Sequence, residues 1–166
     1  MIDHGIRTGQ GSLLVAAAGG EHPTLNADER KASMEAALEA AQGEVPVLAS
    51  IQHTDMRVIL DLARHASKVG LQGAQLGPPY YYEQTEGDAL RLFQMVAKES
   101  DVSILVYHTY WEGLNMSLDL LKQLAEIPTV RGLKWAAPTD DEFRRGITAL
   151  HDDLVIIDNS GNHELS

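Results

Sequence analysis

The sequence predicts an α/β fold with a parallel sheet, and more specifically part of a (β/α) barrel. Short apolar segments alternate with longer amphipathic segments along the chain, as strands alternate with helices in such folds. Several of the short segments are continuously apolar, which is typical of strands covered on both faces. Polar residues follow nearly every short segment, and in a barrel those strand ends converge on one mouth.

Six segments are expected to be strands because they are short, apolar and bounded by turn-forming residues. They cover Ser12–Ala18, Val45–Ile51, Gly73–Leu76, Val102–Tyr107, Val130–Trp135 and Leu154–Asp158. Gly19 and Gly20 follow the first of them, but the Gly-x-Gly-x-x-Gly fingerprint of dinucleotide-binding sheets is absent. We therefore favour the barrel over a doubly wound open sheet.

Five segments between these strands carry apolar residues at helical spacing. They cover Asn26–Gln42, Thr54–Val69, Glu86–Lys98, Ser117–Glu126 and Thr139–His151. Local signals mark some of their ends. Asn26 suits an N-cap, Gly70 suits a helix stop, and Thr139 with Glu142 has the capping-box spacing. Residues 1–9 are expected to form the last turns of a further helix.

The number of strands is small for a barrel. A closed barrel needs eight strands and typically about 250 residues, whereas this chain has 166 residues and six expected strands. We expect a single incomplete barrel domain over residues 1–166, with about strands 2 to 7 present and strands 1 and 8 missing. Such a fragment would expose two strand edges and is expected to be unstable unless a partner closes it.

The composition argues against nucleic-acid binding, cysteine chemistry and membrane insertion. The formal net charge is 13 − 24 = −11, so the surface repels phosphate backbones and nucleic-acid binding is not expected. The chain has no cysteine, which excludes disulfides and thiolate chemistry. No apolar run approaches the roughly 20 residues of a membrane helix, and the first residues do not have the pattern of a signal peptide. We expect a cytoplasmic protein without a membrane partner.

Lys134 is the most informative residue. It lies inside an apolar strand, where burial favours the neutral amine, and a neutral amine can attack a ketone to form a Schiff base. A side chain that reaches outward to solvent would explain it equally well. Tyr107 ends the strand expected next to it, and its phenol could relay protons, although a core tyrosine is the simpler explanation.

Two loops add weaker signals. Three consecutive tyrosines follow Pro78 and Pro79, and such a stiff aromatic turn suggests a ligand mouth or a subunit contact as readily as a packed surface loop. Ala18, Gly19 and Gly20 follow the first strand, where backbone amides can approach an anionic group closely.

Four of these segments, in this order, resemble the dihydrodipicolinate synthase / N-acetylneuraminate lyase family of Schiff-base lyases and aldolases. The segment GEHPTLNADER is similar to the family's Gly-Glu-Ser-x-Thr-Leu segment, and PPYYYEQ is similar to its Pro-Tyr-Tyr segment. The strand SILVYHT resembles the one that ends with the family's catalytic tyrosine, and VRGLKWAAP resembles the one that holds its lysine.

This resemblance implies a partial (β/α)₈ barrel and a specific chemistry. Lys134 would form the imine with an α-keto acid such as pyruvate, Tyr107 would transfer protons, and Tyr81 would reach a neighbouring subunit's site. Neither a metal nor an organic cofactor would be needed. The full-length form would be a homo-oligomer, either a dimer or a tetramer.

The departures from the family pattern also have consequences. Hydroxyl residues that bind the keto-acid carboxylate and complete the proton relay in the family are replaced by Ala18 and Gly19. The amides of Gly19 and Gly20 could hold the carboxylate, but the relay would need a water or another group. His108 replaces the asparagine after the catalytic tyrosine and is expected to contact substrate. No arginine is present over residues 109–113, so true dihydrodipicolinate synthase activity is not expected; a less anionic aldehyde or a dehydratase reaction fits better.

Two alternatives remain open. One is a metal-dependent barrel hydrolase, because several possible ligands fall near strand ends; they are His22, His53, His108, Asp158 and His163. They do not form a compact ligand motif. The other is a truncated, inactive family member that acts only as a structural or interaction module, which the missing hydroxyls suggest.

Overall fold

The computed structural model describes residues 2–160 and contains one sheet of six parallel strands, in the order β1-β2-β3-β4-β5-β6. The strands are β1 Leu13–Val15, β2 Val47–Ser50, β3 Gly73–Leu76, β4 Ile104–Thr109, β5 Val130–Ala136 and β6 Val155–Asp158. The helices are α1 Ile2–Arg7, α2 Ala27–Ala41, α3 Met56–Val69, α4 Glu86–Glu99, α5 Leu118–Ala125 and α6 Asp140–Leu150. Two 3₁₀ turns, η1 Ala18–Gly20 and η2 His22–Thr24, follow β1.

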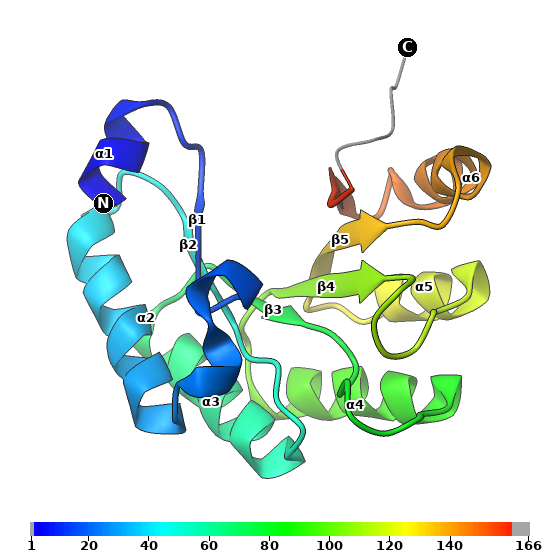
Figure 1. Cartoon of the computed structure of the whole chain (residues 1–166), viewed down its shortest axis with the longest axis horizontal. Coiled ribbons are helices and arrows are strands. Elements are labelled where there is room, and N and C mark those ends of the chain that lie inside the picture. Colours follow the sequence, from blue (N-terminus) through cyan, green and yellow to red (C-terminus); the bar gives the residue numbers. More distant parts are fainter. Residues whose placement is uncertain (1, 161–166) are drawn as a thin grey trace.

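The sheet curves into a half-barrel with helices on its outer side (Figure 1). Sequential strands are neighbours throughout, which is the arrangement of a (β/α) barrel rather than of a doubly wound sheet. The predicted alternation of strands and helices is confirmed, with end points that differ by a few residues. The numbering of the present strands as 2 to 7 of eight stays a prediction.

Local capping contacts, two through side chains and one through a glycine backbone, set the predicted helix ends. Asn26 begins α2 in a full capping box, in which its Oδ1 accepts the Glu29 amide at 3.0 Å and Glu29 accepts the Asn26 amide at 2.8 Å. Thr139 Oγ1 accepts the Glu142 amide at 3.2 Å and starts α6. Gly70 ends α3 at φ 84°, a left-handed conformation that glycine adopts without strain.

The main core lies between the sheet and the helices. Strand residues that face outward pack against the apolar stripes of the helices, as Trp135 does against Phe143 of α6 with ring centroids 5.5 Å apart. Gly146 makes this contact possible, because a Cβ at that position would lie 2.0 Å from the Trp135 ring. Side chains of the alternate strand positions face the concave side, where the functional site must lie.

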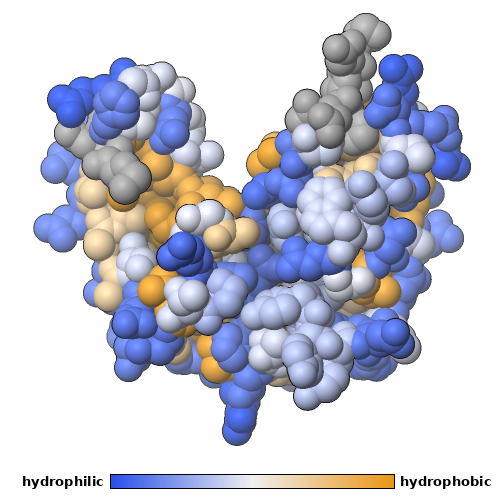
Figure 2. Space-filling view, in the orientation of Figure 1, coloured by the Kyte–Doolittle hydropathy of each residue, from blue (hydrophilic) through white to orange (hydrophobic). Residues whose placement is uncertain are grey.

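The concave side is open. Figure 2 shows the molecule hollowed between the half that carries α1 and β1 and the half that carries β5 and α6. An apolar hollow of about 290 Å³ lies on this side, and Leu48, Leu105 and Val155 are among the residues that line it. Val155 is 69% exposed on β6 at the sheet edge. None of the described helices is long and apolar enough to cross a membrane.

Candidate active site

Lys134 and Tyr107 lie side by side on the concave face. They are register partners of the parallel strands β5 and β4, and the lysine Nζ is 5.3 Å from the centroid of the Tyr107 ring. Both side chains are half-buried. The two residues that sequence reasoning selected on different strands are therefore brought together by the strand register.

The surroundings favour the uncharged form of both groups. Burial lowers the pKa of Lys134 below its usual range, because desolvation penalises the ammonium. Burial, and next the negative charge of Glu112, raise the pKa of Tyr107, while the Thr109 and Asn159 side chains oppose that rise through hydrogen bonding. A neutral amine beside a neutral phenol can attack a carbonyl and exchange protons with the adduct.

Tyr81, predicted as a catalytic residue, lies at the surface of the loop between β3 and α4. It is 73% exposed, and its ring contacts the Tyr82 ring edge-on at a centroid separation of 4.8 Å. Its neighbour Tyr80 is the tyrosine that lines a small cavity together with Tyr107. The sequence placed Tyr80 in the tyrosine run of a possible ligand mouth but did not single it out as a site residue.

Ala18, Gly19 and Gly20, predicted to bind the carboxylate, form the short turn η1 and are exposed or nearly so. The Gly20 amide already donates to the Ala17 carbonyl at 2.9 Å, and the Glu21 amide donates to the Ala18 carbonyl at 3.0 Å. The Gly20 amide is therefore engaged within the turn. The Gly19 amide takes part in neither of these two bonds.

His108, predicted to contact substrate, lies on the other face of β4 from Tyr107. It is register partner of Trp135 and stacks on that ring with centroids 6.1 Å apart. Its Nε2 accepts the Met116 amide at 3.0 Å, which ties the loop after β4 to the strand. Burial lowers the pKa of His108 to about 4, so its imidazole is neutral at pH 7. His108 also lines the small cavity beside Tyr107, and its contact with substrate stays a prediction.

A buried arginine that the sequence did not single out holds the end of β2. The Arg30 guanidinium is 1% exposed and donates to the carbonyls of Ser50 and Gln52, the latter at 2.8 Å. The Gln52 side chain in turn accepts from Gln75 Nε2 at 2.9 Å and lines the same cavity as Tyr107. A charged residue near a helix start carries no sequence signal of burial, so this contact could not be predicted.

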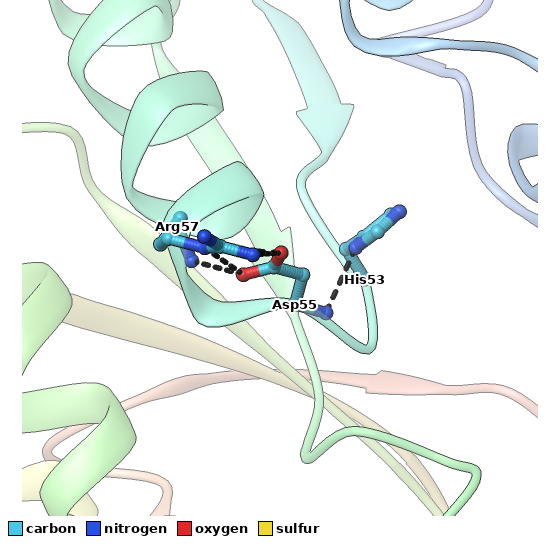
Figure 3. A network of polar contacts seen from close by, with 3 residues as sticks. All are labelled: His53, Asp55 and Arg57. Atoms are coloured by element: carbon cyan, nitrogen blue, oxygen red, sulfur yellow. Dashed lines mark hydrogen bonds and ion pairs between the residues drawn. The ribbon is translucent and has the colours of Figure 1, made fainter.

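Of the histidines considered as metal ligands, His53 and His108 accept backbone amides, whereas the ring nitrogens of His22 have no hydrogen-bond partner within residues 2–160. His53 accepts the Asp55 amide through Nδ1 at 2.9 Å, and Asp55 caps α3 and pairs with Arg57 (Figure 3). Burial, followed by the charges of Arg30 and His53, lowers the pKa of His22 to about 4. Within residues 2–160, no three histidine or acidic side chains are grouped to hold a metal ion. His163 lies outside the described residues.

Comparison with known proteins shows to which family this chain belongs. The model of the Dihydrodipicolinate synthetase family matches residues 1–165. The chain belongs to the dihydrodipicolinate synthetase family. The resemblance inferred from the four sequence segments is thereby confirmed.

Curated relatives of this family member include two 4-hydroxy-tetrahydrodipicolinate synthases. The one from Sphingopyxis alaskensis is 32% identical over 138 residues, which are 82% of this chain and 47% of the relative. The one from Bacillus velezensis is 27% identical over 157 residues, which are 94% of this chain and 54% of the relative. The chain thus spans about half the length of the curated relatives it matches.

Solved structures of the family share the half-barrel. Dihydrodipicolinate synthase from Aquifex aeolicus superposes with a TM-score of 0.88 at 27% identity and covers 93% of this chain and 54% of its own. YagE, a prophage protein of the same family from E. coli K12 solved in complex with pyruvate, has a TM-score of 0.87 at 28% identity and covers the same shares. The half-barrel is therefore part of a known lyase fold.

Proposed function

We propose that the chain carries a Schiff-base-forming lyase or aldolase site that acts on an α-keto acid, with Lys134 as the imine-forming lysine. The observation that supports this most is the position of Nζ 5.3 Å from the centroid of the Tyr107 ring, on the concave face of a family half-barrel. The pyruvate bound to YagE makes pyruvate the first keto acid to test.

The proposed reaction begins with the neutral Lys134 amine. Its lone pair attacks the keto carbon, the carbonyl oxygen takes a proton, and loss of water from this carbinolamine leaves the protonated imine. Tyr107 would supply and remove the protons of these steps. The imine nitrogen then accepts the electron pair of a bond broken at the neighbouring carbon, so no metal is required.

The second substrate is proposed to be neutral or weakly anionic. The loop after β4 contains Tyr110 and Trp111, which are 46% and 58% exposed, and no arginine stands between residues 109 and 113. Aromatic rings at this side of the mouth suit an uncharged aldehyde better than one with a second carboxylate. We therefore propose an aldolase or dehydratase reaction rather than dihydrodipicolinate synthesis.

An inactive interaction module is the alternative that one observation favours. The open edge at β6 exposes Val155 and Ile157, so the half-barrel offers apolar surface that another polypeptide could cover.

Three further points belong to the main proposal. We propose that the six strands correspond to strands 2 to 7 of a full barrel. We also propose that Tyr81 contributes to a neighbouring subunit's site and that the full-length form is a homo-oligomer.

Trapping with borohydride tests the proposed function. The protein is incubated with pyruvate and sodium borohydride, and its intact mass is measured. We expect one covalent keto-acid adduct in the protein and none when pyruvate or borohydride is omitted. A protein that stays unmodified with pyruvate and with a panel of larger α-keto acids would support the inactive module instead.

A further inference from the structure

Thr109 stands two residues after Tyr107 on β4. Residues i and i+2 of a strand share a face, so both side chains point to the concave side. The pairing with β5 has the same spacing, because Tyr107 is opposite Lys134 and Thr109 is opposite Ala136, two residues further along. Thr109 therefore lies one step closer to the mouth of the half-barrel than the proposed reacting pair.

The Thr109 side chain is 2% exposed, and it interacts with the Tyr107 phenol. Within residues 2–160, neither this interaction nor any other contact of the hydroxyl oxygen has the geometry of a normal hydrogen bond. A buried hydroxyl that lacks a full set of partners costs free energy, unless a water or a substrate completes them. The Thr109 hydroxyl is thus free both to donate and to accept a hydrogen bond.

A cavity of about 10 Å³ lies beside this hydroxyl. Thr109 and Tyr107 line it together with Gln52, Tyr80 and Glu112. This volume is about the space that one water molecule requires, and the lining offers several polar groups to hold it. The Glu112 amide donates to the Thr109 carbonyl at 3.3 Å, which keeps the exposed Glu112 next to the cavity.

In the loop after β1, Ala18 and Gly19 occupy the positions where the family resemblance leads one to expect hydroxyl residues. A phenol that receives a proton from a substrate must pass on its own proton, or it carries a positive charge. In this chain, Thr109 is the hydroxyl residue that adjoins Tyr107 on the same strand.

We propose that the Thr109 hydroxyl and one water in the adjoining cavity carry protons between Tyr107 and solvent. This inference rests on the proposed imine at Lys134. When the bond between hydrogen and the carbon next to the imine breaks, its electron pair forms the enamine double bond and the imine electrons move to nitrogen. The proton goes to the Tyr107 oxygen, the phenol proton goes to Thr109, and the Thr109 proton goes to the water, which becomes hydronium and delivers it to bulk water.

This path avoids an ionised phenol. The raised pKa of Tyr107 makes a free phenolate costly at neutral pH, so simultaneous loss and gain of a proton at its oxygen is the less costly route. Glu112 stands at the solvent side with a negative charge that attracts the departing proton. Thr109 acts through Tyr107 and does not itself contact the reacting carbon.

The test is the exchange of pyruvate methyl protons for deuterium in D₂O, followed by proton NMR, because exchange requires repeated enamine formation. The variant Thr109→Val keeps the shape of the side chain and loses the hydroxyl, whereas Thr109→Ser keeps the hydroxyl. We expect exchange to fall by about tenfold or more in Thr109→Val and to stay within about twofold in Thr109→Ser. The final yield of borohydride-trapped adduct, measured after the reaction is complete, should be the same in all three proteins, because each keeps Lys134.

The outcomes separate the two proposals. If the wild type forms no adduct, the proposed function fails and the relay fails with it. If the adduct forms and Thr109→Val exchanges protons as fast as the wild type, the relay alone is overturned. Thermal melting of each variant checks its fold, and Thr109→Ala replaces Thr109→Val in the same comparison if the valine variant does not melt cooperatively.

Discussion

Tyr107 and Lys134 are direct register partners on β4 and β5, and the lysine Nζ lies 5.3 Å from the centroid of the phenol ring. Parallel pairing holds the two groups at the same height on the concave face, and partial burial favours the neutral form of each. The backbone ladder thus supplies the positioning that an imine-forming site needs, before any loop contributes to it.

The rate of imine formation should report the lowered pKa of Lys134. Only the neutral amine attacks the ketone, so the rate of adduct formation rises with pH through the pKa of this group. Because burial lowers that pKa, the rate should reach half its maximum below pH 10.5, the ordinary value for lysine. Initial rates of borohydride trapping across the alkaline range measure this. A midpoint at or above the ordinary value would contradict the role given to burial.

Replacement of Tyr107 by phenylalanine should affect formation of the keto-acid adduct much less than proton transfer at the carbon next to the imine. The ring and its packing against Lys134 are kept, so the keto-acid adduct should still accumulate, but more slowly, because Tyr107 supplies the protons of imine formation. Proton exchange at the neighbouring carbon should fall by about 10²–10⁴-fold, the usual range for loss of a general acid–base group. Tyr82→Phe is the matched control, because Tyr82 is 70% exposed on a loop. Equal exchange rates in both variants would exclude Tyr107 from the chemistry.

Local sequence signals predicted most of the framework. The strand Gly73–Leu76 has the predicted bounds, and the caps at Asn26 and Thr139 and the stop at Gly70 are where short-range hydrogen bonding requires them. These features depend on neighbours within a few residues, which a single sequence contains. The closeness of Lys134 and Tyr107 followed from placing their strands side by side.

The residues around Lys134 and Tyr107 were harder to predict. For some of them, the sequence does indicate which face of the strand the side chain occupies. Strand alternation places the His108 side chain on the opposite face from Tyr107 and the Thr109 side chain on the same face, so a period of two already predicts which of them adjoins the phenol. Burial of Arg30 has no such signal, because it depends on the carbonyls of Ser50 and Gln52 at the end of β2, which are 20 and 22 residues away. Loop conformations, such as the turn that engages the Gly20 amide, are likewise set by the folded structure.

Gly146 should be intolerant of any side chain. An added Cβ would lie 2.0 Å from the Trp135 ring, so Gly146→Ala must push α6 away from β5. We expect a loss of about 1–3 kcal/mol in the free energy of unfolding. Gly87→Ala on α4 is the control, since its Cβ would meet only ordinary contacts and should gain up to about 1 kcal/mol. Urea unfolding of both variants measures this, and an unaffected Gly146→Ala would contradict the described packing of α6.

His108 should make stability dependent on pH. Its folded pKa of about 4 lies below the ordinary 6.5, so the unfolded chain binds the proton more readily, and stability is lost as pH falls from 6.5 toward 4. His22, lowered to about 4 as well, adds in the same direction.

The variant His108→Phe tests this contribution. It removes the acceptor of the Met116 amide and should cost about 1–3 kcal/mol at neutral pH. Because phenylalanine does not titrate, the stability difference between wild type and variant should shrink as pH falls below 6.5. Urea midpoints at neutral and mildly acidic pH measure the difference. A difference that stays constant would show that His108 does not titrate as described.

The position of the trapped keto acid tests the central claim most directly. The chain has five lysines, at positions 31, 68, 98, 122 and 134, and each could react with pyruvate and borohydride. Protein treated with both reagents is digested, and the modified peptide is identified by mass spectrometry, with Lys134→Arg and Lys122→Arg treated in parallel. We predict that the label is on Lys134, disappears in Lys134→Arg and persists in Lys122→Arg. A label spread over the surface lysines, or one that persists in Lys134→Arg, would contradict the assignment of Lys134 as the imine-forming residue.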